Sequence, residues 1–222
     1  MRIHGYTVCV NYADLFETAL PRWKNALDSL MVITTPADEV TQSLVKTAGA
    51  SLHLTDVFSA RGAHFNQAAG LNDGFQLNSK ERGDGDWILF FDADVIPPND
   101  IRARIEMCEP KIGHLYGANR HLEDGRRIND PYPAGFFLLF NTQDPNAKVT
   151  PIVETCWMHC GNWDTRFISR WTRDRLHFMP IPLRHIGNPG ENWCGRGNTK
   201  AMNELLAERR RRRDWRHEKI QE

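Results

Sequence analysis

The fold is decided by the stretch Trp87-Ile88-Leu89-Phe90-Phe91-Asp92-Ala93-Asp94-Val95-Ile96-Pro97-Pro98, in which an apolar run meets an Asp-x-Asp step and two prolines. A continuous apolar run of this length is typical of a strand that is buried on both faces in the middle of a sheet. Ligands of open α/β sheets bind beyond the carboxyl ends of the strands. The stretch therefore predicts a central strand whose end carries the chemistry of the protein.

Strands and helices alternate upstream of this stretch. We expect strands at 7–10, 30–34 and 51–54, and helices at 14–27, 38–48 and 66–77. Such alternation indicates a Rossmann-like α/β fold in which a mainly parallel sheet with right-handed crossovers is flanked by helices.

The second half has shorter elements and most of the tryptophans. Strands are expected at 115–116 and 136–140, a polar loop at 119–133, and a helix at 165–171. We predict a single domain, residues 1–222, with a nucleotide-binding half (1–110), a substrate-facing subdomain (111–198) and a basic C-terminal helix (199–222).

Composition narrows the class of protein. The chain has 222 residues, 28 basic against 28 acidic, and 41% hydrophobic residues, which excludes wholesale disorder. No apolar run approaches the roughly 18 residues of a membrane span, and no apolar leader is seen, so we expect a cytoplasmic location. Five cysteines do not suggest a disulfide framework, and Cys156, His159, Cys160 and Cys194 match no common structural zinc spacing.

Asp92 and Asp94 point to a metal ion. Two carboxylates this close repel each other unless a cation sits between them, and Mg²⁺ or Mn²⁺ would leave coordination sites for phosphate oxygens. The alternative is an acidic turn that caps the next helix, although Asn99 or Asp100 already serves that purpose. We favour the metal site.

At this point the sequence resembles the glycosyltransferases with the GT-A fold, particularly family 2. Asp92-Ala93-Asp94 is similar to their DxD motif, the stretch 65–74 to the Asn-rich helix that precedes it, and the stretch 8–12 to their opening strand. The resemblance implies a transferase that uses a nucleotide-sugar, with a UDP-sugar favoured, and Mn²⁺ or Mg²⁺. Compact enzymes of this kind occur in phages, which would place the protein in the host cytoplasm.

The resemblance also implies roles for individual residues. Asp94 would bind the metal, and Asp92, with Ala93 between them, would reach the donor ribose or the metal. Tyr12 would stack on the base, or Asn11 would hydrogen-bond it.

Four further positions concern the donor. Asn66 belongs to the motif helix, and Arg61 lies where the family often has a basic residue near the diphosphate, with a solvated loop arginine as the equal alternative. His185 would be the third metal ligand, since many GT-A enzymes use a late histidine. The usual acidic pair after the second strand is replaced here, with Asp38 only later, which leaves the base open.

The acceptor side is expected around the stretch 161–167. An inverting transfer needs a carboxylate to accept the proton of the attacking hydroxyl. The resemblance implies Asp164 as this base, with Glu154 as the second choice and a helix cap as the structural alternative. Trp163 would stack on the acceptor, and Gly135 would line the floor between the two substrates.

The C-terminal segment is basic. From Thr199 onward eight basic and five acidic residues give +3, which leaves −3 for the preceding body. Arg209, Arg210 and Arg211 would contact nucleic-acid phosphates, although a solubilising tail explains them equally well.

These observations predict a metal-dependent glycosyltransferase. Its acceptor would be a hydroxymethylated pyrimidine in phage DNA, or alternatively a saccharide or another small molecule. Two other classes stay open: a nucleotidyltransferase, and a non-catalytic module that binds nucleic acid.

Overall fold

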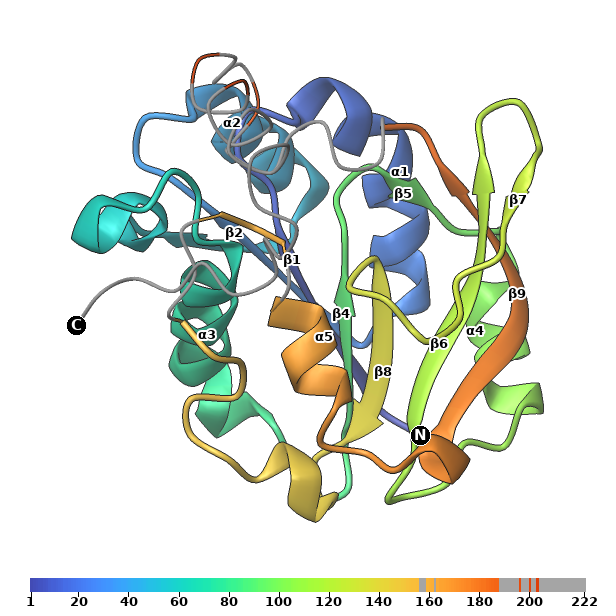
Figure 1. Ribbon diagram of the computed structural model, residues 1–222. Coiled ribbons are helices and arrows are strands. Elements are labelled where there is room, and N and C mark those ends of the chain that lie inside the picture. The colour runs from blue at the N-terminus through green and yellow to red at the C-terminus, as the bar shows by residue number, and fades with distance from the viewer. Residues whose placement is uncertain (156–158, 162, 188–195, 197–199, 201–202, 204–222) are drawn as a thin grey trace.

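The computed structural model describes residues 1–155, 159–161, 163–187, 196, 200 and 203. A twisted sheet lies at the centre, with helices on both faces (Figure 1). Its strands are β1 (Ile3–Val8), β2 (Ser29–Thr34), β3 (Ser51–Leu54), β4 (Trp87–Phe91), β5 (Val95–Ile96), β6 (Leu115–Leu122), β7 (Arg127–Ile128), β8 (Phe137–Asn141) and β9 (Leu176–His185). The helices are α1 (Ala13–Ala26), α2 (Glu39–Ala48), α3 (Gln67–Leu77), α4 (Ile101–Met107) and α5 (Trp163–Ile168).

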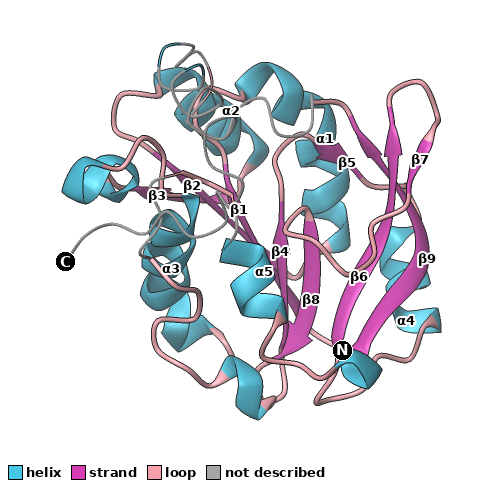
Figure 2. Cartoon of the chain, viewed as in Figure 1, coloured by secondary structure: helices cyan, strands magenta, loops and turns pink. Residues whose placement is uncertain are grey.

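The strand order confirms the α/β expectation. It runs β3-β2-β1-β4-β8-β6-β9-β5, and β7 pairs with β6 (Figure 2). The strands β3, β2, β1 and β4 are parallel to one another, as are β6 and β9, whereas β8 runs antiparallel to both β4 and β6. Both predicted halves therefore contribute to one sheet.

The second half is more regular than its sequence suggests. The loop expected at 119–133 is wrong in part, because β6 continues to Leu122 and turns back into β7. The strand β9 was not expected, because Pro180 and Pro182 take its outward positions and interrupt the usual strand signal. Its inward positions are nevertheless apolar, and Met179, Ile181 and Leu183 are buried.

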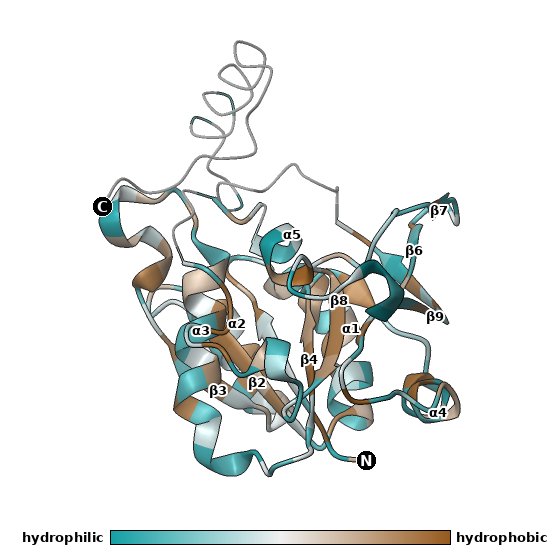
Figure 3. Cartoon of the chain, turned by 60° about the horizontal axis from the view of Figure 1, so that its bottom comes forward, coloured by the Kyte–Doolittle hydropathy of each residue, from teal (hydrophilic) through white to brown (hydrophobic). Residues whose placement is uncertain are grey.

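Each face of the sheet has its own core. On one face α1, α2 and α4 pack over a cluster in which Trp23 stacks on Phe91 at 4.2 Å between ring centroids. On the other, α3 and α5 cover a second cluster that includes Phe90 and Phe167. The hydropathy colours show the result, with brown central strands beneath helices whose outer surfaces are teal (Figure 3). A strand buried between two such layers, as β4 is, leaves only its ends for polar chemistry.

Helix α1 fixes the chain just after the Asp-x-Asp step. The indole Nε1 of Trp23 donates to the carbonyl of Val95 at 2.9 Å, and Nη1 of Arg22 donates to the carbonyl of Pro97 at 3.0 Å. These bonds satisfy backbone oxygens that the short strand β5 would otherwise leave unpaired.

No helix in the part of the chain that the structure describes has the length and apolar content of a membrane span.

Candidate active site

Asp92 is the first residue after β4, and its surroundings disfavour the charged form of its carboxyl group. Its Oδ1 accepts a hydrogen bond from Nε2 of Gln67 on α3 at 3.1 Å. Burial, followed by the negative charge of Asp94, raises the pKa of Asp92 to about 6. Gln67 was not singled out in the sequence, although it lies within the motif helix.

Asp94 meets His185 through the pairing of β5 with β9. Val95 is in register with His185, and the backbone N–H of Ile186 donates to the carbonyl of Asp94 at 2.9 Å. As a result His185 Nε2 lies 3.3 Å from Asp94 Oδ1, with both side chains largely buried. The predicted proximity of Asp94 and His185 is therefore present in the structure.

Gly187 allows this close approach. A Cβ atom at Gly187 would lie 2.0 Å from Oδ2 of Asp94, a separation that real side chains do not tolerate. Glycine thus lets the backbone after β9 pass directly over the carboxylate.

The donor set at this edge suits a divalent cation in part. His185 Nδ1 is buried without a hydrogen-bond partner, and the two aspartates hold negative charge that an imidazole alone does not balance. Carboxylate and imidazole are suitable ligands for Mn²⁺. Among the described residues, however, no three His, Cys, Asp or Glu side chains converge on one point. Asp94 and His185 form the closest pair, while Asp92 is turned toward Gln67.

Asp164 lies on the α3 and α5 side of the same edge. It is in the first turn of α5, and its Oδ2 accepts the backbone N–H of Gly135 at 3.0 Å. The charge of Asp164 contributes to the raised pKa of Asp92, which places the two carboxylates near each other. The carbonyl of Phe136 in turn accepts the backbone N–H of Asp92 at 3.4 Å. The Gly135–Phe136 backbone therefore contacts both acids, one through an N–H and the other through a carbonyl.

Asn11 and Asp38 shape the turn after β1. Asn11 has a positive φ of 60°, and its backbone N–H donates to Oδ2 of Asp38 at 2.6 Å. The same carboxylate accepts from the side chain of Thr34 and from the backbone N–H of Thr41. Asp38 therefore ties the ends of β1 and β2 together, a role that the sequence did not reveal.

Tyr12 lies next to the metal candidates and beneath an arginine. Burial, then the charge of Asp94, raises the pKa of Tyr12. The guanidinium of Arg196 lies 5.0 Å from the Tyr12 ring centroid, donates to the carbonyl of Asn11 at 3.0 Å, and forms an ion pair with Asp14. The segment 188–195 that precedes Arg196 lies outside the described residues.

Solved structures share this architecture. Glucosyl-3-phosphoglycerate synthase from Mycobacterium tuberculosis superposes with a TM-score of 0.59 at 12% identity, over 85% of this chain and 73% of the other. Mannosyl-3-phosphoglycerate synthase from Rubrobacter xylanophilus gives 0.55 at 13% identity, over 98% and 76%, and TarS from S. aureus gives 0.57 at 11%, over 84% and 60%. No protein-family model and no curated protein matches the chain in sequence.

The chain has the GT-A fold of glycosyltransferases. One structure of the Mycobacterium tuberculosis synthase holds Mn²⁺, UDP-glucose and phosphoglyceric acid; it superposes with a TM-score of 0.59 at 12% identity, over 85% of this chain and 72% of that one. At such low identity the likeness establishes the fold, and the roles of single residues depend on the geometry of this chain.

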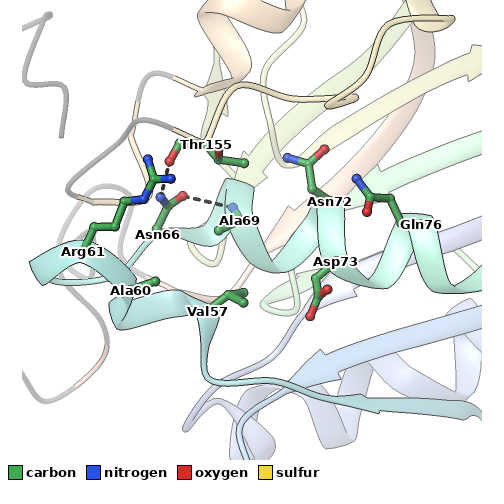
Figure 4. Close-up of a pocket in the computed structure, with 9 residues that line it drawn as sticks. All are labelled: Val57, Ala60, Arg61, Asn66, Ala69, Asn72, Asp73, Gln76 and Thr155. Carbon is green, nitrogen blue, oxygen red and sulfur yellow. Dashed lines mark hydrogen bonds between the residues drawn. The ribbon is translucent and has the colours of Figure 1, made fainter. Parts of the chain in front are cut away.

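Two residues lie elsewhere than the GT-A resemblance implies. Trp163 is only 2% exposed and donates from Nε1 to Oε1 of Gln67 at 3.2 Å, so its ring belongs to the core instead of stacking on an acceptor. Arg61 lines an open hollow of about 250 Å³ on the flank of α3, together with Asp73 and Gln76 (Figure 4). Ala93 is buried in the core between the two aspartates.

Both polar atoms of the Asn66 side chain bond to the backbone. Its Oδ1 accepts the N–H of Ala69 as the cap of α3, and its Nδ2 donates to the carbonyl of Thr155 at 2.6 Å (Figure 4). This arrangement gives Asn66 a structural task in the GT-A fold, whatever else it contacts.

We therefore expect Asn66→Ala to lower the free energy of unfolding by about 1–2 kcal/mol, because a helix cap and a long-range hydrogen bond are both lost. Urea denaturation would measure the change, with Gln76→Ala, an exposed substitution on the same helix, as the control. A variant with wild-type stability and weakened donor binding would instead assign Asn66 to the donor site.

Several predictions fall on residues that the structure does not describe. Arg209, Arg210 and Arg211 and the rest of the predicted basic helix belong here, as do Cys156 and Cys194 of the zinc alternative. The second-choice base Glu154 is described, and its Oε2 lies 3.6 Å from Nε of Arg166.

Proposed function

We propose that the protein transfers a sugar from a nucleotide-sugar to an acceptor hydroxyl, with a UDP-sugar as the favoured donor. The observation that supports this most is the edge of the sheet where Asp92, Asp94, His185 and Asp164 gather at the ends of β4, β9 and α5. The GT-A fold, and the UDP-sugar and Mn²⁺ held by a neighbour with this fold, support the same reaction.

Asp164 would act as the general base of an inverting transfer. The proton of the acceptor hydroxyl moves to the carboxylate of Asp164, and the hydroxyl oxygen forms a bond to C1 of the sugar. The bond from C1 to the diphosphate breaks, and the nucleoside diphosphate leaves with both bonding electrons. Gly135 holds Asp164 in place through its N–H.

Asp94 and His185, with Asp92, would hold Mn²⁺ or Mg²⁺. When bound there, the ion would neutralise the negative charge that develops on the departing diphosphate. Tyr12 and Asn11 would border the base at the end of β1, and Arg61 would reach the diphosphate only if η1 (Val57–Gly62) shifts from its present place.

Thermal-shift screening of UDP-, GDP- and dTDP-sugars with and without Mn²⁺ tests the proposal. We expect stabilisation that needs both nucleotide and metal. Product analysis separates the alternatives, since a nucleoside diphosphate is the product of sugar transfer and pyrophosphate that of nucleotidyl transfer. A purely nucleic-acid-binding protein would release neither. The anomeric configuration of the product would test the inverting course.

For the acceptor we propose a hydroxymethylated pyrimidine in DNA, with a saccharide or other small molecule as the alternative. The support for DNA is the basic C-terminal sequence. Incubation with hydroxymethylated duplex DNA and a labelled donor would give labelled DNA if the proposal holds, and unlabelled DNA would eliminate this acceptor.

Asp92 offers a test that depends on pH. Because its pKa is raised to about 6, the folded state keeps a proton that the unfolded carboxyl releases near pH 4. The stabilisation is therefore present below about pH 4 and lost as the pH rises through about 6. Asp92→Asn copies the protonated form, so its melting temperature in EDTA should exceed that of the wild type at pH 7 and equal it at pH 4.

The exposed substitution Asp84→Asn serves as the control for this measurement, and it should leave the difference between pH 4 and pH 7 unchanged. A destabilised Asp92→Asn protein at pH 7 would contradict the electrostatic account of Asp92.

A further inference from the structure

The face of β9 that lies opposite the first core, together with the β6–β7 hairpin, is open to solvent in the described part of the chain. On this side of the sheet α3 and α5 cover the second core, whereas the outward residues of β9 are exposed. They are Phe178, Pro180, Pro182 and Arg184. The β6–β7 hairpin continues this face and is hydrophilic (Figure 3).

Three basic side chains lie in register across this face. His121 of β6 pairs with Arg127 of β7 on one side and with Arg184 of β9 on the other. Residues in register project to the same face, and neighbouring strands are about 4.8 Å apart, so the Cα atoms of Arg127 and Arg184 lie about 10 Å apart. We call Arg127, His121 and Arg184 the basic row.

The basic row has no acidic partner among the residues that the structure describes. Arg127 donates to Oδ1 of Asn119 at 3.0 Å, a neutral group. Neighbouring arginines differ: Arg126 pairs with Asp124 and Arg120 with Asp130. Arg127 and Arg184 therefore carry positive charge that no described carboxylate balances, which suits an anion.

The row lies on the same side of the sheet as the candidate base. Arg184 projects away from Met179, Ile181 and Leu183 of the first core, which is the side that α5 with Asp164 covers. The candidate base and the row therefore share one side of the sheet. An acceptor whose hydroxyl lies at Asp164 would project the rest of its structure along this face.

We propose that the basic row binds a phosphate group of the acceptor, an inference that rests on the proposed function and names its substrate class. Two guanidinium groups about 10 Å apart at their Cα atoms can converge on one phosphate, and each offers the paired N–H donors that phosphate oxygens prefer. The phosphate can belong to a small monoester or to the backbone of a nucleic acid.

The test compares Arg127→Ala/Arg184→Ala with Arg126→Ala/Arg175→Ala. The second pair removes the same charge from arginines that have carboxylate partners, Asp124 and Asp174. Titration calorimetry with glycerol 3-phosphate and fluorescence anisotropy with a labelled 12-nucleotide single strand provide the two probes. Removal of the row should weaken at least one probe ten-fold or more, and the control pair should weaken it less than three-fold.

The probes distinguish the two sources of phosphate. Row-dependent binding of glycerol 3-phosphate indicates a small phosphorylated acceptor. Row-dependent binding of the oligonucleotide alone, with a salt dependence whose slope falls by about 1.4, indicates a nucleic acid. If neither probe binds the wild type, or if the row variant binds both as the wild type does, the inference is overturned.

The proposed function is judged separately in the same variants. Stabilisation by UDP with Mn²⁺ should be equal in the wild type and in both double variants, because the row lies outside the donor site. If UDP with Mn²⁺ did not stabilise the wild type, the donor assignment would be refuted. The phosphate-binding result would then be judged from the two probes alone.

Discussion

Replacing Asp94 by asparagine is expected to lower sugar transfer at least about a thousand-fold. The carboxylate faces His185 at 3.3 Å and adds to the charge that raises the pKa of Asp92, so it is central to the negative field at this edge. An amide in its place removes the charge and leaves the shape. Stabilisation by UDP that depends on Mn²⁺ should disappear in the same variant, measured by thermal shift beside the rate of UDP release.

The control for this prediction is Asp100→Asn, an exposed aspartate in the cap region of α4 that pairs with Arg104. It should keep wild-type transfer and wild-type response to metal. Wild-type activity of Asp94→Asn would refute the donor site described above, and equal losses in both variants would indicate a general effect on folding.

A second variant would displace the carboxylate of Asp94 without changing its charge. In Gly187→Ala the new methyl group would lie 2.0 Å from Oδ2 of Asp94, so the carboxylate or the strand end must move. Transfer should fall together with the response to Mn²⁺ while the carboxylate is still present. That result would show that the position of Asp94, in addition to its charge, sets the activity.

The sequence predicted the elements whose signals are local. The apolar run 87–91 located β4, and Gly49 ends α2 in the left-handed conformation expected of a helix-ending glycine. Helix α3 was likewise predicted, at 66–77, and Asn66, the first residue of that prediction, is its N-cap.

Features that depend on distant pairing were harder to predict. The contact between Asp94 and His185 was expected only from the family resemblance, because it requires β9 to pair with β5 about ninety residues away. The role of Asp38 became visible only once β1 and β2 lay side by side.

Trp163 lies in the core although the sequence favoured a place at the surface. An aromatic residue beside an acid suggested a ring on which the acceptor could stack, but in the structure Trp163 is buried against Phe90. Sequence alone does not say which neighbours will cover a tryptophan, and the acceptor surface is therefore better sought on the open face of β9 and the β6–β7 hairpin.

Asp164→Asn is the substitution that tests the chemical step. Loss of the base should reduce kcat about a hundred-fold to ten-thousand-fold, because the attacking hydroxyl would have no group to accept its proton. The asparagine oxygen can still accept the N–H of Gly135, so the floor of the site should keep its shape. Binding of UDP with Mn²⁺ should accordingly equal that of the wild type.

The split between kcat and KM separates a base from a residue that binds the donor. In Asp164→Asn the loss should appear in kcat, while the KM for the donor stays that of the wild type. Glu154→Gln is the informative comparison, since Glu154 lies beside Arg166 and was the second choice as base. If Glu154→Gln abolished transfer while Asp164→Asn retained it, the proton would have to go to Glu154, and Asp164 would only hold Gly135 in place.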